Sequence, residues 1–279
     1  MKWNRANRQR VMKRAYVTML CGGDSYAPGV EALGRSLRAS GSREPMIVMT
    51  AADVPQSVKF ALAVQGWGVR EIDALPSPAR GEALFPRFDH VFSKLRAWQL
   101  TDIEKVVLLD ADTLVLRNVD DLFERPSIAA APDFLMPDRF NSGVMVLEPS
   151  AEIFQRMLEA LHGAESYDGG DQGFLNTFFA GWYGMPVAHR LPAGYNLFHF
   201  IFQFVHGHPA LRSTLLHEAR IVHYAVQKPW RGLPQITGAS APWWAMYYGA
   251  HPEQDSALRR RIHELEDWTF ERIIDVFIL

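Results

Sequence analysis

Cysteine is almost absent from this sequence. Cys21 is the only one in 279 residues, which excludes an internal disulfide framework and any zinc module built on several cysteines. No apolar run approaches the ~18 residues of a membrane-spanning helix, and the N-terminus lacks the apolar stretch of a signal peptide. A basic excess is also missing, since 29 Lys and Arg face 31 Asp and Glu, so no nucleic-acid partner is expected. With 48% hydrophobic residues, the composition favours a folded cytoplasmic enzyme or binding domain.

Charge is unevenly distributed along the chain. Residues 1–14 hold six basic side chains and no acidic one. The simpler interpretation is a solvated leader, and the alternative is a surface anchor for an acidic partner or for acidic lipid, the latter giving peripheral contact with a membrane. We therefore separate a basic arm (1–14) from a domain at 15–250, and we expect residues 251–279 to form a C-terminal helix packed on that domain.

Strands and helices alternate through the first half of the chain. The pattern predicts strands at residues 15–20, 46–50, 69–72, 105–109, 129–131 and 144–147, and helices at 28–37, 55–64, 92–100, 152–161 and 171–180. Such alternation indicates an α/β fold with a doubly wound parallel sheet. Residues 189–234 are rich in aromatics, His, Gly and Pro, which is typical of loops that shape a pocket.

Asp110 and Asp112 directly follow the apolar strand at 105–109. Carboxylates at the carboxyl edge of such a strand lie where open α/β sheets bind ligands, and a cation would offset their repulsion. The alternative is a turn in which both acids face water or cap the next helix. Oxygen ligands favour Mg²⁺ or Mn²⁺, and such ions bind the phosphates of a substrate as well. The sequence has neither a P-loop nor a dinucleotide-binding glycine motif, so those two nucleotide folds are disfavoured.

Four further features could carry chemistry, and each has a structural alternative. His223 ends a strand-like run and could add an imidazole that favours Mn²⁺, although a lone histidine is more often structural. The segment 168–173 combines acids with glycines, while Asp171 could simply cap the next helix. The segment 141–143 fits either a turn or a hydroxyl-binding site. Lys94 lies in an amphipathic helix, where a lysine is by default a solvated charge.

Taken in order, these segments resemble glycosyltransferase family 8, in particular its glycogenin-like branch. The resemblance runs from Ala15 to Trp230 and rests on the segments 15–18, 24–27, 93–98, 109–113, 120–123, 130–133, 140–144, 168–176, 195–196, 222–224 and 228–230. It implies a single Rossmann-like domain of the GT-A type, with a mixed, mostly parallel sheet flanked by helices. It also implies Mn²⁺-dependent, retaining transfer of a hexose from a UDP-sugar, with UDP-glucose expected before UDP-galactose.

The resemblance also implies roles for individual residues. Asp110, Asp112 and His223 would hold the metal. The UDP-sugar would contact Met19, Cys21, Tyr26, Arg87, Lys94, Ala111, Asp133, Asn141, Ser142, Asp168 and Lys228. The reacting centre would involve Lys94, Asp168, Asp171 and Gln172. Asp171 is the candidate to face the anomeric carbon, either as a nucleophile or as a charge that stabilises an oxocarbenium-like centre.

Departures from the family pattern limit what is carried over. Segment 198–204 has no tyrosine where glycogenin glucosylates itself, so self-glycosylation there is not expected. The stretch from His223 to Lys228 is one residue shorter than in glycogenin, with Val226 where a glycine would stand. We expect a sugar, polyol or lipid-linked acceptor, and the aromatic residues at 198–204 could support a homodimer. Two other functions stay open: a metal-dependent hydrolase of nucleotide-diphosphate sugars, and a UDP-sugar-binding module without turnover.

Overall fold

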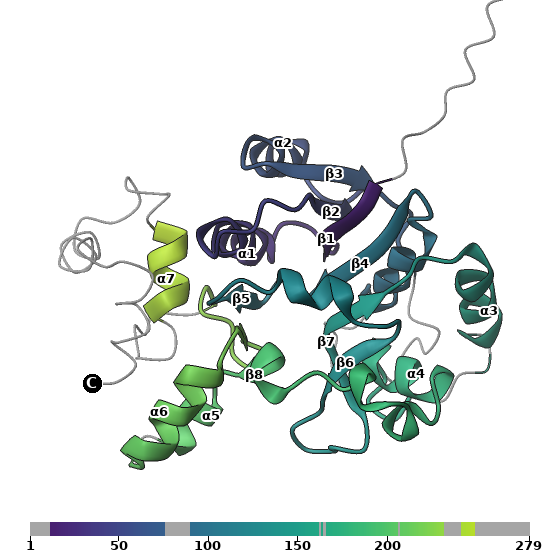
Figure 1. The fold of residues 1–279 in the computed structure, drawn as a ribbon. Coiled ribbons are helices and arrows are strands. Elements are labelled where there is room, and N and C mark those ends of the chain that lie inside the picture. Colours follow the sequence, from purple (N-terminus) through teal and green to yellow (C-terminus); the bar gives the residue numbers. More distant parts are fainter. Residues whose placement is uncertain are drawn as a thin grey trace, which may run out of the picture.

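A six-stranded sheet forms the centre of the computed structural model, which describes residues 12–75, 90–161, 163, 166–205, 207–231 and 241–248. The strand order is β3-β2-β1-β4-β7-β6 (Figure 1). The strands are β1 (Met12–Leu20), β2 (Met46–Thr50), β3 (Trp67–Glu71), β4 (Ile103–Leu109), β6 (Ala129–Pro132) and β7 (Phe140–Leu147). The first four run parallel, whereas β7 is antiparallel to both β4 and β6. The expected α/β class with a mixed, mostly parallel sheet is confirmed.

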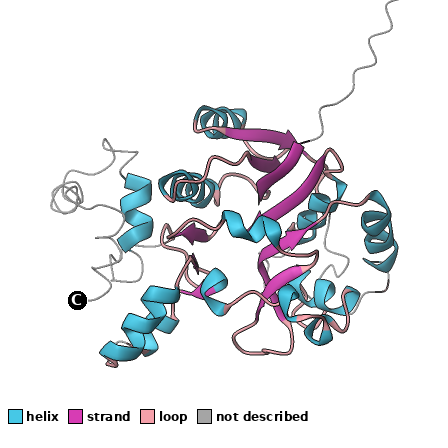
Figure 2. Cartoon of the chain, in the orientation of Figure 1, coloured by secondary structure: helices cyan, strands magenta, loops and turns pink. Residues whose placement is uncertain are grey.

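Helices cover both faces of this sheet (Figure 2). One face carries α1 (Ala27–Ala39) and α2 (Gln56–Val64), and the other carries the 3₁₀ helix η2 (Val91–Gln99), α3 (Ala151–Leu161) and α4 (Asp171–Phe178). Successive strand residues point to opposite faces, so in β1 Tyr16 joins the first core cluster and Val17 joins the second. Burial on both faces explains why the strands read as continuous apolar runs.

A second, three-stranded sheet lies beside the first and completes the edge that carries the site. Its order is β5-β9-β8, and Thr113 pairs with His223. The strands are β5 (Thr113–Val115), β8 (Leu197–Phe198) and β9 (Ile221–His223). The remaining helices are α5 (Ile201–Phe204), α6 (Pro209–Glu218) and α7 (Ala241–Tyr248), with 3₁₀ turns η3 (Asp120–Glu124), η4 (Trp182–Gly184), η5 (Val187–His189) and η6 (Ala193–Asn196). The pairing of β5 with β9 thereby brings residues 113–115 next to residues 221–223, although the two segments are far apart in the sequence.

Helix α1 packs directly against the backbone of the site. Pro28 lies in its first turn, as expected for a helix start, and the chain leaves the helix through Gly41 at φ 90°. A Cβ on Gly29 would fall 2.3 Å from the carbonyl oxygen of Ala111, so a larger residue would push the helix away. This close approach places the start of α1 against Ala111.

Several predicted boundaries were wrong. β1 begins at Met12, earlier than expected, and the helix predicted at 92–100 is the 3₁₀ helix η2. Residues 141–143 belong to β7 rather than to a loop before it, because their polar groups are paired inside the molecule. Of the segment 189–234, for which loops were expected, the described residues 189–205 and 207–231 hold β8, β9, α5 and α6, which bury apolar side chains in a third core cluster.

Other expectations fall on residues that the structure does not describe. The predicted C-terminal helix at 251–279 and residues 1–11 of the basic arm lie outside the described residues. Within the described part of the chain, no helix combines the length and apolar character needed to cross a bilayer.

Candidate active site

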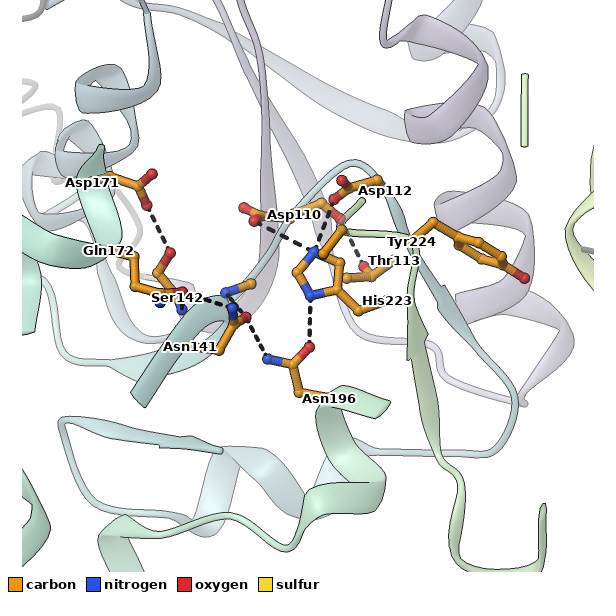
Figure 3. Close-up of polar contacts among 12 residues, drawn as sticks. Asp110, Asp112, Thr113, Asn141, Ser142, Asp171, Gln172, Asn196, His223 and Tyr224 are labelled. Carbon is orange, nitrogen blue, oxygen red and sulfur yellow. Dashed lines mark hydrogen bonds and ion pairs between the residues drawn. The ribbon is translucent and has the colours of Figure 1, made fainter. Parts of the chain in front are cut away.

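Asp110, Asp112 and His223 come together where the two sheets meet. Nε2 of His223 lies 3.3 Å from Oδ1 of Asp112 and 4.0 Å from Oδ2 of Asp110 (Figure 3). Each residue offers one ligand atom, and these atoms lie within 4.8 Å of one another. Two carboxylates and an imidazole form a donor set that suits Mn²⁺. The three side chains therefore fit the divalent ion that the sequence indicated.

Backbone hydrogen bonds hold the turn that carries the two aspartates. The N–H of Asp110 donates to the carbonyl of Gly143 in β7 (2.8 Å), and the Thr113 hydroxyl donates to the carbonyl of Asp110 (2.7 Å). The N–H of Tyr224, the residue that follows β9, donates to the carbonyl of Asp112 (2.8 Å) and so ties the turn to the end of that strand. The turn is thus fixed from three strands, and both carboxylates lie beside His223 rather than in open solvent.

Lys94 is a buried cation between two carboxylates. Its Nζ lies 2.8 Å from Oδ1 of Asp110 and 2.6 Å from Oδ2 of Asp171, and it donates to the hydroxyl of Ser142 (3.2 Å). Burial alone lowers the pKa of Lys94, but the charges of Asp110 and Asp171 outweigh burial and raise it. The default expectation of a solvated lysine is therefore wrong, and η2 delivers this charge to the site.

Lys228 neutralises the second aspartate of the pair. Its ammonium forms an ion pair with Oδ2 of Asp112 and donates to the carbonyls of Tyr224 (2.7 Å) and Ala225 (2.8 Å). Burial alone raises the pKa of Asp112, but Lys228 and His223 outweigh it and hold that pKa well below its usual range. The pKa of Asp110 is raised, because burial and the charge of Asp112 exceed the effect of Lys94.

A network of amides and acids continues from Asp171 along β7 and α4. Oδ2 of Asp171 accepts a hydrogen bond from the hydroxyl of Ser142 (2.8 Å). Nδ2 of Asn141 donates to Oε1 of Gln172 (2.7 Å), and Nε2 of Gln172 donates to Oδ2 of Asp133 (3.3 Å). These five side chains, predicted from separate segments, are brought together by the structure.

The Asp168 carboxylate shapes the loop before α4. Its Oδ1 accepts hydrogen bonds from the N–H groups of Gly170 (2.9 Å) and Gly173 (3.0 Å). The side chain of Asp171 contacts Lys94 and Ser142 instead, and the N-cap residue of α4 is Gly170, which has no side chain to cap the helix. Asp168 thus satisfies backbone amides at the helix start, while Asp171 is left to face the site.

A cavity of 340 Å³ opens beside the aspartate pair. Of the predicted residues, its lining includes Met19, Cys21, Tyr26, Lys94, Asp110, Ala111 and Asp171. Burial raises the pKa of the Cys21 thiol to about 11, so this thiol is neutral at physiological pH. Arg87 lies outside the described residues.

Sequence reasoning missed two polar residues of the site. Arg231 lines the cavity, and its guanidinium lies 5.0 Å from the ring centroid of Tyr26. Asn196 lies on the far side of His223, with Oδ1 at 2.9 Å from Nδ1 of the imidazole. Arg231 directly follows the segment 228–230, and Asn196 belongs to the segment 195–196, both of which carry the family resemblance. These positions were a signal that could have found both residues.

Comparison with known proteins places this geometry in a family. No family model matches the chain. Glycogenin-1 of Mus musculus is 39% identical over 222 residues, which cover 78% of this chain and 65% of that protein. The putative UDP-glucuronate:xylan alpha-glucuronosyltransferase 4 of Arabidopsis thaliana is 37% identical over 221 residues, or 79% of this chain and 37% of that protein.

The fold comparison agrees with the sequence comparison. The solved structure of the galactosyltransferase LgtC, in complex with donor and acceptor sugar analogs, matches with a TM-score of 0.61 at 21% identity. The match covers 84% of this chain and 95% of that one, which supports the GT-A fold. The chain spans 65% of the length of mouse glycogenin-1 and 37% of the plant protein, so these likenesses do not show that it has the activity of either whole protein. Within those limits, the chain belongs to the glycogenin-like branch of glycosyltransferase family 8.

Proposed function

We propose that the chain transfers a hexose from a UDP-sugar to a hydroxyl acceptor, with Mn²⁺ and with retention of anomeric configuration. The observation that carries the proposal is the cluster of Asp110, Asp112 and His223 beside a cavity that Lys94 and Asp171 also line. Bound there, Mn²⁺ would supply positive charge against the negative charge that grows on departing UDP.

The chain's own cations support the same step. Arg231 lines the cavity, and Nζ of Lys228 lies 5.8 Å from the ring centroid of Tyr26. A ring flanked by cations and open to the cavity suits a uracil base with a diphosphate next to it. Tyr26 would stack on the base, with Met19 and Cys21 beside it, while Lys228 and Arg231 would bind the phosphate oxygens.

The polar cluster behind Asp171 would orient the sugar. A hydrogen bond from the hydroxyl of Ser142 and an ion pair with Lys94 hold the Asp171 carboxylate in one orientation. A fixed carboxylate near the anomeric carbon could act as a nucleophile or stabilise positive charge on the ring. Gln172, with Asn141 and Asp133, would position the ring hydroxyls.

The donor and the acceptor require separate screens. UDP-glucose and then UDP-galactose are the expected donors, and UDP-glucuronate belongs in the panel because it is named for a relative that is 37% identical. Segment 198–204 contains no tyrosine, so we propose that the acceptor is a separate molecule. Sugars, polyols and lipid-linked glycosides are the classes to test.

UDP release in the presence of Mn²⁺ tests the proposal. We expect release that depends on an acceptor and that falls at least about 100-fold in Asp112→Asn, since the ion would lose a ligand. The exposed Asp138→Asn serves as the matched control and should retain full activity. Release without any acceptor would instead support a hydrolase, and binding without release would support a non-catalytic module. Failure to bind any UDP-sugar contradicts the proposal.

A further inference from the structure

The side chain of Asn196 connects His223, a candidate metal ligand, to Asn141 of the polar network at Asp171. Asn196 ends η6 and is buried, with 8% of its surface exposed. Its Nδ2 donates to Oδ1 of Asn141 over 2.7 Å, and its Oδ1 lies 2.9 Å from Nδ1 of His223 (Figure 3). One side chain amide therefore bridges the two halves of the site.

Two backbone amides determine which way the side chains of this bridge point. The N–H of Gly143 meets the amide of Asn141 at 2.9 Å, and because an N–H can only donate, the Asn141 atom that faces it must be oxygen. The N–H of Ser142 likewise donates to the amide oxygen of Gln172 (3.3 Å), which leaves Nδ2 of Asn141 to donate to that same oxygen (2.7 Å). Flipping either amide would set donor against donor.

The orientation of the Asn141 amide determines which nitrogen of the His223 ring carries the proton. Because Oδ1 of Asn141 accepts, Asn196 must turn its NH₂ group toward it. The oxygen of Asn196 then faces His223, and a hydrogen bond at 2.9 Å requires that Nδ1 carry the proton. Nε2 is the ring nitrogen that remains, and it faces Asp112 at 3.3 Å and Asp110 at 4.0 Å.

We propose that Asn196 is a positioning residue that selects the Nδ1–H form of His223 and thereby presents Nε2 as a metal ligand. The inference rests on the proposed function, because it concerns a divalent ion at this site. A partner on the second nitrogen commonly fixes the tautomer and ring plane of a ligating histidine. The ring of Phe198 packs edge-on to His223 with centroids 5.3 Å apart, which restrains the same plane from another side.

The tautomer can be measured without any activity. ¹⁵N NMR of the metal-free protein, at a pH where the ring is neutral, distinguishes Nδ1–H from Nε2–H. We expect the Nδ1–H form in the wild type and a loss of that preference in Asn196→Ala. Asn196→Asp keeps an acceptor at Nδ1 while losing the donor to Asn141, so it should keep the Nδ1–H form.

Mn²⁺ affinity, followed by the EPR signal of the free ion, gives a second readout. We expect Asn196→Ala to weaken Mn²⁺ binding about 10- to 100-fold, the usual cost of losing such a partner. Asn196→Asp should recover most of that loss. The control is Asn118→Ala, because Asn118 is exposed and its side chain, among the residues that the structure describes, hydrogen-bonds only to Asp120.

The outcomes separate this inference from the proposed function. An Nε2–H form in the wild type overturns the inference, as does an Asn196→Ala protein with unchanged tautomer and unchanged Mn²⁺ affinity. If Asn196→Ala does not fold, the tautomers of the wild type and of Asn196→Asp decide the matter. A wild type that shows the Nδ1–H form but binds no Mn²⁺ contradicts the proposed function and the ligand role of Nε2, whereas the selection of the tautomer by Asn196 stands.

Discussion

At the scale of single residues, contacts with several neighbours restrict the position of the His223 ring. Asn196 holds one ring nitrogen, the aspartate pair faces the other, and Gly143 lies against the ring edge. A Cβ on Gly143 would fall 2.3 Å from Cε1 and 2.6 Å from Nδ1 of the imidazole. The absence of a side chain at this position is therefore what allows the ring to lie between Asn196 and the carboxylates.

Gly143→Ala should displace the imidazole and weaken Mn²⁺ binding at least about tenfold. Inserting a methyl group into this packed position should also lower the free energy of unfolding by about 1–3 kcal/mol. Calorimetric Mn²⁺ titration and urea unfolding measure the two effects. Gly163→Ala is the control, because a Cβ there meets nothing within 4 Å. Wild-type metal affinity in Gly143→Ala would show that His223 is not held by this contact.

Arg231 gives a second prediction at this scale. Its guanidinium lies over Tyr26 in the cavity, and it makes no ion pair with any residue that the structure describes. We expect Arg231→Gln to weaken UDP binding about tenfold while leaving uridine binding nearly unchanged, because the lost bonds go to phosphate. Arg43→Gln, an exposed arginine, is the control. An equal loss for uridine and UDP would mean that Arg231 supports the base rather than the diphosphate.

At the scale of elements, β3 is tied to the turn that precedes β4 by a two-pronged ion pair. The guanidinium nitrogens of Arg70 lie 2.6 and 2.5 Å from the two carboxylate oxygens of Asp102. This hydrogen bonding lowers the pKa of Asp102 below its usual range. Because β4 carries Asp110 at its end, the pair helps hold the strand that presents the site.

The pair should make stability depend on pH in a defined direction. A carboxyl whose pKa is lowered in the folded state stabilises the protein above its unfolded pKa, about 3.9, and loses that contribution as the pH falls. Asp102→Asn should therefore cost about 1 kcal/mol at pH 7 and much less near pH 2. Urea unfolding at both pH values measures this. A cost that does not shrink in acid would contradict the assignment.

Elements with strong local patterns were predictable from the sequence, and the contacts between distant elements were not. The apolar run before Asp110 indicates a buried strand, and Pro28 with Ser40-Gly41 marks both ends of α1. In contrast, the sequence left Asn141 and Ser142 open between a turn and a hydroxyl-binding site, because their partners in α4, Gln172 and Asp171, are not visible in the local pattern. The role of Asn196 was missed for the same reason, because its contact with His223 depends on the pairing of β8 with β9.

At the scale of the whole molecule, each of the two sheets contributes some of the residues of the candidate site. The larger sheet supplies Asp110 and Asn141 from the ends of β4 and β7, and the smaller sheet supplies His223 from β9. Neither sheet alone brings together the three candidate ligands, Asp110, Asp112 and His223. The family likeness also depends on this arrangement, since the ordered motifs come from both sheets.

Self-modification is a whole-molecule property that mass spectrometry can test. Segment 198–204 offers phenylalanine and histidine where a tyrosine hydroxyl would be needed, so we expect no added hexose on incubation with UDP-glucose and Mn²⁺. Intact mass before and after incubation measures this. Introducing a hydroxyl with Phe204→Tyr, an exposed position, provides a comparison. A hexose found on segment 198–204 of the wild type would contradict the expectation.

Calorimetric titration of UDP into the wild type and into Asp110→Asn, with and without Mn²⁺, tests the central claim most directly. Wild-type affinity should rise at least about tenfold when Mn²⁺ is present, because the ion would link the carboxylates to the diphosphate. That gain should vanish in Asp110→Asn. Equal UDP affinity with and without Mn²⁺ in the wild type would contradict the account.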